Sequence, residues 1–306
     1  MTAMTSPFGP LVIIANPRSG RGRVEAALPE IERILQDQGL AYRVVRTTHP
    51  GHATQAARDA LRAGERYLVA AGGDGTVHEV ANGMIEDGRP LAADAVLGVV
   101  SAGSGGDFVR SFGLPPDAEQ AARHLAGDRV RPLDVGTVTC ADGPSRYFVN
   151  IAEAGLGGAV VARAARLSRR LGGARYAAGF WLALPGFRPA AVRLDADGHA
   201  HAWRAFNVVV ANGRFYGGGM HISPKSDPCD QALDILVMTG PKSDSFTTLP
   251  KVYQGAHLPH RNIAELRAGQ LRVEADAPFP VEADGELLGT TPASFGIIPS
   301  AVRLKL

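Results

Sequence analysis

The sequence has few cysteines and no long apolar run. Its 306 residues include only Cys140 and Cys229, which lie far apart and outside any C-x-x-C spacing. Neither a disulfide framework nor a thiolate zinc site is therefore expected, and a reducing cytoplasm fits best. The opening segment MTAMTSPFGP lacks the basic and apolar regions of a secretion signal, and no stretch reaches about 18 uninterrupted apolar residues. Any membrane contact should therefore be peripheral, at the inner face.

The sequence also has little net charge. Its 32 basic and 30 acidic residues leave a formal net charge of +2, which gives no reason to expect nucleic acid as a partner. Apolar residues are plentiful by contrast: 45% of the chain is hydrophobic, enough for a substantial core, and the length suggests two domains. The oligomeric state stays open, with a homodimer as one option.

Short β-branched runs alternate with helical patterns through the first part of the chain. These runs are LVIIA (11–15), YRVVRT (42–47), YLVAA (67–71) and AVLGVV (95–100). This alternation predicts a parallel sheet with helices on both faces. From about Leu133 onward, β-like runs separated by Gly, Pro and Asp turns predict a mostly antiparallel second domain, with helices near 159–184 and 243–256.

Three glycine-rich loops each follow an apolar run and precede a helical pattern. They are NPRSG (16–20), GGDGT (72–76) and SAGSGG (101–106). In an open α/β sheet such loops lie at the carboxyl ends of the strands, where ligands bind. Glycines let backbone N–H groups approach phosphate oxygens, and a helix amino terminus adds partial positive charge. One such loop is more often an ordinary turn, whereas three aligned loops favour a phosphate site.

The loop spacing excludes two common phosphate-binding motifs. The chain has neither G-x-x-x-x-G-K-S/T nor a G-x-G-x-x-G with an acidic residue about 20 positions later. Thr76 and Glu79 have the spacing of a capping box, so we expect a helix to begin at Thr76. Because both motifs are absent, the chain would have to bind phosphates through a different loop arrangement.

The string GGDGT, within AAGGDGTVHEVANGM, resembles the diacylglycerol kinase catalytic family, which includes bacterial lipid kinases and sphingosine kinases. Further landmarks follow in order along most of the chain: TTHPGHA (47–53), GSGGDFVRSFGLP (103–115), LDVG (133–136), FVNIAEAGLG (148–157), NGRFYGGGMHISPKSD (212–227) and ADGE (283–286). GGDGT also occurs in NAD kinases, but the last two segments point away from them.

This resemblance implies an α/β plus β fold. Residues 1–134 would form an NAD-kinase-like, doubly wound nucleotide-binding domain, and residues 135–292 a β-sandwich substrate domain. The C-terminal residues from about 293 to 306 are expected to return to the first domain.

The resemblance also implies ATP and Mg²⁺ as cofactors. The implied nucleotide-binding residues are Asn16, Pro17, Arg18, Ser19, Gly20, Thr47, Gly72, Gly73, Asp74, Gly75, Thr76, Val77, His78 and Ser104. By similarity, Asp74, Asp107 and Asp134 form a water-bridged network around the catalytic Mg²⁺. From the residues alone, Asp107 could equally be a helix cap and Asp134 a turn carboxylate.

A second, structural metal is implied by similarity within PKSDPCDQALDI. Its ligands would be Asp227, Asp230 and the backbone carbonyl of Ala232, and oxygen ligands suit Mg²⁺ or Ca²⁺. The alternative is an ordinary polar loop, because Gln231 replaces the glycine that is usual in the family.

The triplet Asp284-Gly285-Glu286 is the implied catalytic centre, since the family's D-G-E projects from the second domain into the cleft. The spacing alone favours a surface hairpin turn, for which Asp-Gly is common. Either Asp284 or Glu286 could take the proton from the acceptor hydroxyl, with the other orienting it or contacting nucleotide.

The match has four departures: Ser101 stands where the family often has Pro, Gly106 where Asn is usual, Gly157 where Asp is usual, and Gln231 where Gly is usual. Because the carboxylates are retained, these changes suggest altered substrate or kinetics before loss of catalysis.

A basic and aromatic run between residues 159 and 187 could contact lipid. It contains Arg163, Arg166, Arg169, Arg170, Arg175, Tyr176, Phe180, Trp181 and Phe187. Such a mixture suits an anionic membrane surface, although a helix with solvated arginines and inward aromatics is the more common arrangement.

We therefore expect an ATP- and Mg²⁺-dependent kinase that phosphorylates a hydroxyl of diacylglycerol or a related lipid. The alternatives are a kinase of a soluble hydroxylated metabolite and a nucleotide-binding regulatory protein with weakened turnover, the latter suggested by Gly106 and Gly157.

Overall fold

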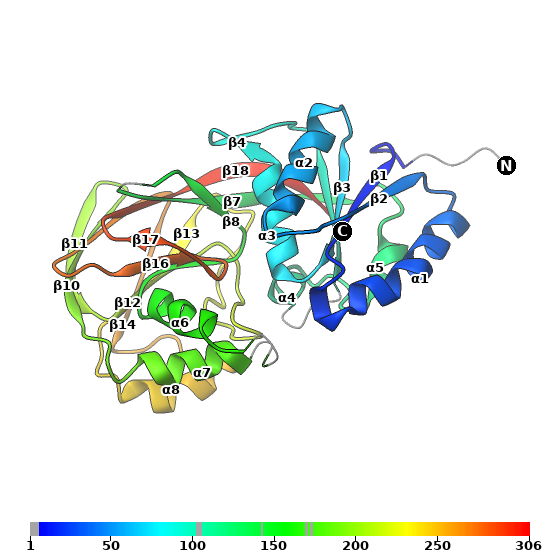
Figure 1. Ribbon diagram of the computed structural model, residues 1–306. Helices are drawn as coiled ribbons and strands as arrows, with labels where there is room; N and C mark the ends of the chain where they lie inside the picture. Colours follow the sequence, from blue (N-terminus) through cyan, green and yellow to red (C-terminus); the bar gives the residue numbers. More distant parts are fainter. Residues whose placement is uncertain (1–5, 102–105, 142, 169–170, 172–173) are drawn as a thin grey trace. The chain divides into compact units, whose positions relative to one another are not determined.

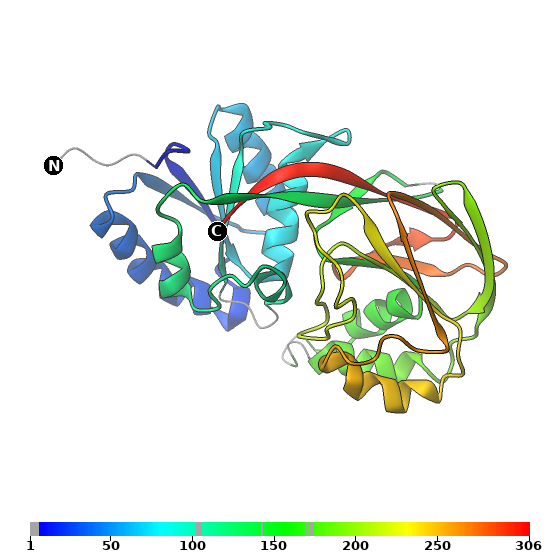
Figure 2. The ribbon, with the colours of Figure 1, turned by 180° about the vertical axis from the view of Figure 1, so that it is seen from behind.

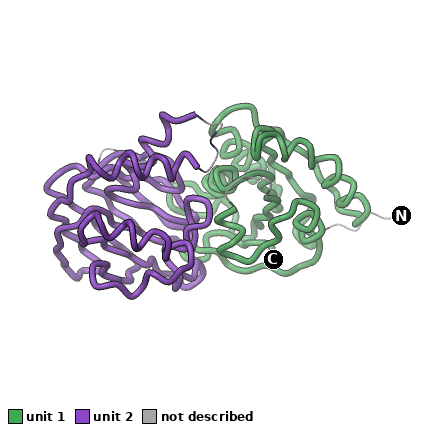
Figure 3. Tube along the Cα trace, turned by 90° about the horizontal axis from the view of Figure 1, so that it is seen from below, with its two compact units in different colours: residues 1–134, 299–306 green, residues 135–298 purple. Residues whose placement is uncertain are grey.

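The protein is described by a computed structural model that covers residues 6–101, 106–141, 143–168, 171 and 174–306. It divides into two compact units (Figure 3). Unit 1 contains residues 1–134 and 299–306, and unit 2 contains residues 135–298. The chain passes between the units twice, within strands β7 (Val130–Cys140) and β18 (Ala293–Lys305). The C-terminal return to unit 1 therefore begins at Pro299.

A parallel sheet forms the centre of unit 1 (Figure 1). Its strands, in spatial order, are β2 (Tyr42–Arg46), β1 (Leu11–Ala15), β3 (Tyr67–Gly72), β6 (Val96–Ser101) and the end of β18. All four neighbouring pairs are parallel. The four β-branched runs that were expected to be strands are confirmed as strands.

Helices cover both faces of this sheet. Leu11 and Ile13 of β1 pack in a cluster with α1 (Arg23–Asp37) and α5 (Ala118–His124). Val12 and Ile14, which point the opposite way, are fully buried as well. On that second face lie α2 (His52–Arg62) and α3 (Asp74–Gly83) (Figure 1). The remaining elements of unit 1 are η1 (Ser19–Arg21), β4 (Ile85–Glu86), β5 (Arg89–Pro90) and α4 (Asp107–Phe112).

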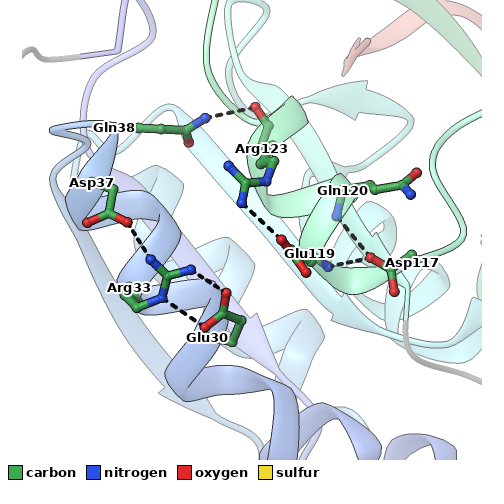
Figure 4. A network of polar contacts seen from close by, with 8 residues as sticks. All are labelled: Glu30, Arg33, Asp37, Gln38, Asp117, Glu119, Gln120 and Arg123. Atoms are coloured by element: carbon green, nitrogen blue, oxygen red, sulfur yellow. Dashed lines mark hydrogen bonds and ion pairs between the residues drawn. The ribbon is translucent and has the colours of Figure 1, made fainter.

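Polar side chains join α1 and α5 at the surface (Figure 4). Arg33 pairs with Glu30 and Asp37 on its own helix, each at 2.6 Å. Asp117 caps α5 by accepting from the amides of Glu119 and Gln120, at 3.0 and 3.1 Å. The side-chain amide of Gln38, at the end of α1, donates to the Arg123 carbonyl of α5 at 3.1 Å and so links the two helices. Because these groups are exposed, the apolar cluster beneath them dominates the packing.

Two sheets form unit 2. The first is antiparallel throughout, in the order β14 (Ile263–Ala268), β13 (Leu233–Met238), β12 (Asn207–Ala211), β9 (Ile151–Gly155), β16 (Pro280–Ala283) and β17 (Glu286–Thr290). The second contains β11 (His199–Ala205), β10 (Ala190–Ala196), β15 (Gln270–Ala275) and the start of β18, with β7 and β8 (Arg146–Phe148) beside it.

One apolar core joins the two sheets. Val192 and Leu194 of β10 and Val208 and Val210 of β12 belong to the same buried cluster, which is the layered arrangement of a β-sandwich. The expected fold, a doubly wound α/β unit and a β-sandwich unit, is confirmed.

In the part of the chain that the structure describes, the sandwich is accompanied by helices α6 (Leu156–Ala165), α7 (Ala174–Ala183) and α8 (Asp244–Tyr253). They gather at one side of unit 2 in both views (Figures 1 and 2). Leu156, Ala183 and Phe206 form the small apolar cluster beneath α6 and α7. Within the described residues, no helix has both the length and the hydropathy needed to span a membrane.

Candidate functional site

Loops that follow neighbouring strands of unit 1 meet at the carboxyl edge of its sheet. The Asn16 amide donates to the Ala71 carbonyl at 3.0 Å, which links the loop after β1 to the end of β3. The Thr47 amide donates to the Ala15 carbonyl at 2.8 Å and brings the end of β2 to the same edge. The Asp74 carboxylate accepts from the Phe108 amide at 3.0 Å, linking the loop after β3 to α4.

Asn16 organises the first of these loops. Its side-chain oxygen accepts from the Arg18 amide at 3.1 Å, and its carbonyl accepts from the Ser19 amide at 3.0 Å. Its side-chain nitrogen lies 3.5 Å from the Thr76 hydroxyl. The predicted residues between Asn16 and Gly20 are thus folded into one turn beside the GGDGT loop.

The helix after GGDGT begins earlier than the capping-box spacing predicted. Helix α3 starts at Asp74, with Gly73 as its extended N-cap residue, so Thr76 lies inside its first turn and the capping-box prediction is wrong. A Cβ atom on Gly72 would lie 2.2 Å from the Thr76 hydroxyl oxygen, so the glycine lets the helix close directly onto the strand end. Glu79 instead accepts from the Ala53 amide of α2 at 3.1 Å.

Within the GGDGT loop, the first turn of α3 is the part that an anion could approach. Asp74 and Gly75 stand where a helix leaves amides without an intrahelical acceptor, and such amides bind anions. Gly75 is exposed, and no atom lies within 4 Å of the position its Cβ would take. Val77 and His78 are buried, so any contribution from them to a phosphate site comes through the backbone. Ser104 lies outside the described residues.

Asp107 and Asp134 do not lie where the residues alone suggested, namely at a helix cap and in a turn. Asp107 is the first residue of α4 and pairs with Arg110 at 3.1 Å, while Gly106 is the N-cap residue. Gly106 has φ 69°, a conformation that Asn also tolerates, so this departure from the family leaves the backbone path intact.

Asp134 is a strand residue, so its interpretation as a turn carboxylate is wrong. It is fully buried within β7, and its carboxylate accepts from the Ser300 amide of β18 at 2.7 Å. Ser300 has φ 48°, which is unfavourable for a residue with a Cβ. The carboxylate compensates by satisfying the amide at this irregular point of the strand, and the chain therefore continues as strand through Asp134.

The donor chemistry around α3 and α4 is compatible with Mg²⁺ held through water. Asp74 contacts the backbone next to Asp107, which brings two carboxylates to the start of α4. Among the described residues, no three His, Cys, Asp or Glu side chains converge closely enough to bind a metal ion together. The water-bridged network that includes Asp134 stays a prediction.

The predicted structural-metal loop forms a compact turn in unit 2. The Asp230 amide donates to the Asp227 carbonyl at 3.2 Å, and the Asp230 carboxylate accepts from the Ala232 amide at 3.2 Å. The other Asp230 oxygen pairs with Arg267. Gln231 has φ 63°, the left-handed conformation that the family's glycine adopts without strain. The ligand assignment stays a prediction.

The triplet Asp284-Gly285-Glu286 forms a hairpin turn between β16 and β17. Asp284 and Gly285 have φ 47° and 88°, as in a type I′ turn, and Ala283 pairs with Glu286 across it. The Asp284 carboxylate accepts from three successive backbone amides, those of Val149, Asn150 and Ile151, at 2.8 to 3.1 Å. Glu286 is exposed. Asp284 thus holds the segment between β8 and β9, whereas Glu286 is accessible to solvent.

A second Asp-Gly hairpin in unit 2 has the same design. Asp197 and Gly198, between β10 and β11, have φ 51° and 84°. The Asp197 carboxylate accepts from the amides of Gly269 and Gln270, at 2.9 and 2.8 Å. No Glu follows the glycine in this turn. A change at Asp197 therefore tests the structural role of such an aspartate without any chemical role.

Two buried glutamates near the D-G-E turn were not among the site residues predicted from the sequence. Glu153 and Glu282 lie in the strands IAEAG and PVEA and have 3% and 2% of their surface exposed. The detectable signal was a charged residue at the centre of an apolar strand. Glu153 also accounts for Gly157, because a Cβ there would lie 1.8 Å from its carboxylate oxygen. The family's usual Asp could not occupy position 157 while Glu153 keeps this position.

Comparison with known families matches both units. Residues 10–138 match the diacylglycerol kinase catalytic domain, and residues 150–306 match the YegS C-terminal NAD kinase beta sandwich-like domain. Fold and strand-end loops thus define a two-domain protein of the NAD-kinase-like type. The chain belongs to the diacylglycerol kinase catalytic family.

Individual relatives agree with this assignment. A diacylglycerol kinase of Bacillus subtilis is 30% identical, over 92% of this chain and 91% of that protein. A diacylglycerol kinase of Mycobacterium tuberculosis is also 30% identical, over 97% of this chain and 95% of that protein. The crystal structure of a diacylglycerol kinase from Bacillus anthracis covers 98% of this chain and 97% of its own, with a TM-score of 0.74 at 22% identity, and this likeness shows the fold.

Proposed function

We propose that this protein is an ATP- and Mg²⁺-dependent lipid kinase that phosphorylates a hydroxyl of diacylglycerol or a related lipid. The observation that carries the proposal is the meeting of strand-end loops around the first turn of α3, where Gly75 is exposed, in a chain of the diacylglycerol kinase family. The amides at this turn provide donors for phosphate, and glycine at position 75 leaves room for it.

Each unit supplies a different part of the proposed reaction. Unit 1 would bind the nucleotide, and the carboxylates of Asp74 and Asp107 would hold Mg²⁺. The ion neutralises charge on the phosphates when bound. In unit 2, Glu286 or Asp284 takes the proton of the acceptor hydroxyl, which is a poor nucleophile until that proton is removed.

Turnover separates this proposal from its alternatives. The protein is incubated with γ-labelled ATP, Mg²⁺ and either mixed lipid vesicles or a soluble metabolite pool, and the product is extracted with organic solvent. We expect the label in the organic phase. Label retained in water as a phosphorylated metabolite would favour a soluble-substrate kinase, and binding of ATP without transfer would favour a regulatory protein.

An exposed aromatic patch on α7 and α8 supports a lipid acceptor. Trp181 and Phe246, with 42% and 65% of their surface exposed, lie with ring centroids 5.0 Å apart. Leu182 and Tyr253 on the same helices are also exposed. Phe180, in contrast, packs partly against the small core beneath α7, so the aromatics divide between core and surface. Arg166, at the end of α6, is exposed, whereas Arg169 and Arg170 lie outside the described residues.

We expect the double variant Trp181→Ala and Phe246→Ala to bind anionic vesicles at least tenfold less tightly than the parent. Burial of a large apolar side chain contributes about 1.5–3 kcal/mol, and about 1.4 kcal/mol is tenfold in affinity. Vesicle sedimentation measures the effect, with Leu287→Ala as the control because Leu287 is exposed elsewhere, on β17. Equal sedimentation of parent and double variant would remove the patch from the lipid-binding surface.

A further inference from the structure

Glu153 and Glu282 face each other inside unit 2 at a point next to the D-G-E turn. They are register partners of the antiparallel strands β9 and β16. Like charges directly opposite in a sheet repel, and two buried carboxylates in one site do not both ionise readily. The pair therefore retains a proton at a pH where exposed glutamates are ionised.

Hydrogen bonds connect the two members of the pair to different parts of unit 2. The Asn207 amide nitrogen donates to Glu153 at 2.6 Å, and the Asn207 oxygen accepts from the Gly157 amide of α6 at 3.1 Å. Glu153 is thereby anchored to β12 and α6. Glu282 accepts from the Gly285 amide at 2.8 Å, so it holds the second residue of the turn.

Burial dominates the titration of both groups. It raises the pKa of Glu153 to about 7, although hydrogen bonds from Asn207 and Tyr216 lower it. Burial, followed by the charge of Glu153, raises the pKa of Glu282 well above its usual range. Asp284 raises the pKa of Glu282 further, while the bond from the Gly285 amide lowers it.

Among the described residues, further titratable and charged groups lie on the elements around the pair. The Tyr216 hydroxyl lies 3.5 Å from the Glu153 carboxylate. Burial raises the pKa of Tyr216 well above its usual value, and Tyr253 of α8 adds to this shift. On α6 and α7, Arg163 is exposed and Tyr176 lies near Gly285, while Glu286 of β17 is exposed.

We propose that Glu153 and Glu282 share one proton and that this protonated pair positions the Asp284–Gly285 turn. When the shared proton leaves, repulsion from the anchored Glu153 pushes Glu282 away, and its hydrogen bond to the Gly285 amide weakens. Both glutamates are therefore positioning residues. Their effect on turnover rests on the proposed kinase function, whereas their effect on the turn does not.

The direction of the pH dependence follows from the raised pKa of Glu153. Between its ordinary value of 4.5 and about 7, the folded state binds more protons than the unfolded state. Stability is thus greatest below this window and is lost as pH rises through it, with the unfolding constant rising by up to tenfold per pH unit for each proton.

The test compares Glu153→Gln with a matched control, Glu274→Gln, which alters a partly exposed glutamate of β15. Urea unfolding and hydrogen exchange of the Gly285 amide are followed from about pH 5 to about pH 8. In the parent and the control, stability and Gly285 protection should fall as pH rises. In Glu153→Gln both should fall less steeply, because the titration of Glu153 is gone and no charge at position 153 repels Glu282, and the alkaline decline of kcat should move to higher pH.

Identical pH slopes in parent and Glu153→Gln would overturn the inference, as would pH-independent protection of Gly285 in the parent. Should Glu153→Gln fail to fold, infrared spectra of the glutamate-labelled parent decide the question, because a shared proton requires a protonated carboxyl band at neutral pH. A parent that transfers no phosphate at any pH would refute the proposed function, while amide exchange would still decide whether the pair holds the turn.

Discussion

Replacement of Glu286 by Gln is expected to lower kcat by roughly 10² to 10⁴ while the fold stays intact, if Glu286 is the base, because a positioned base contributes about this much. The side chain is exposed, so its amide variant should unfold at the parental urea concentration. Initial rates at saturating ATP and lipid measure the effect. Glu274→Gln, in a partly exposed strand position of the same unit, should leave kcat unchanged.

Asp284→Asn is expected to affect stability as well as rate. Its two oxygens accept from three amides, and replacing one of them by an NH₂ group leaves a donor facing a donor. The free energy of unfolding should fall by about 1 kcal/mol, the lower end of the cost of an unsatisfied polar group, because Asp284 is only partly buried. Asp197→Asn provides the control, because its carboxylate holds a similar hairpin through two amides.

The comparison of these variants identifies the base. If Asp284 takes the proton, Asp284→Asn should lose far more kcat than Glu286→Gln, while Asp197→Asn loses stability alone. If Glu286 takes it, the order of the two kcat losses reverses. Near-parental kcat in both variants would show that the triplet is only a hairpin turn, and the proposed proton transfer would have to be abandoned.

Gly75→Val is expected to abolish stabilisation by ATP. For the parent, ATP at 100 times its Kd should raise the free energy of unfolding by about 2.7 kcal/mol. Open space surrounds the position of the missing Cβ, so the variant should fold, and its branched side chain would occupy the place where a phosphate approaches. The melting temperature with and without ATP measures the loss.

The matched control is Gly186→Val, at another glycine whose Cβ would meet nothing within 4 Å. It lies in unit 2 and should retain the full ATP response. Gly72 is unsuitable for this test, because its side chain would overlap Thr76 and disturb the fold itself. An unchanged ATP response in folded Gly75→Val would refute the assignment of the phosphate site to the first turn of α3.

Strands β1, β3 and β6 of unit 1 were predictable because each is a short apolar run buried on both faces, and the partly exposed β2 was predictable from its β-branched residues. The turn at Asp284 was also predictable as a hairpin, since Asp-Gly favours positive φ at both positions. Contacts distant in sequence were not predictable in the same way. Asp134 forms its hydrogen bond with a residue 166 positions away, and no local pattern around LDVG indicates that partner.

The start of α3 and the buried glutamate pair show two further reasons why parts of the structure could not be predicted from the sequence. A spacing rule placed the helix cap at Thr76, but the close packing of Thr76 on Gly72 allowed an earlier start. Glu153 and Glu282 become a pair only through strand register, which the sequence of either strand does not reveal. Local propensity therefore located the elements, whereas tertiary packing determined the chemistry between them.

The discontinuity of unit 1 affects its biosynthesis. Strand β18 pairs with β6 through Arg303 and Leu304, which follow the whole of unit 2 in the chain. A nascent chain that ends before Pro299 would leave the amides and carbonyls of β6 along an open sheet edge, which invites pairing with other chains. At roughly 5–20 residues per second, the ribosome completes unit 2 before this edge can close. The proposed nucleotide-binding unit is therefore the first to emerge and the last to be completed.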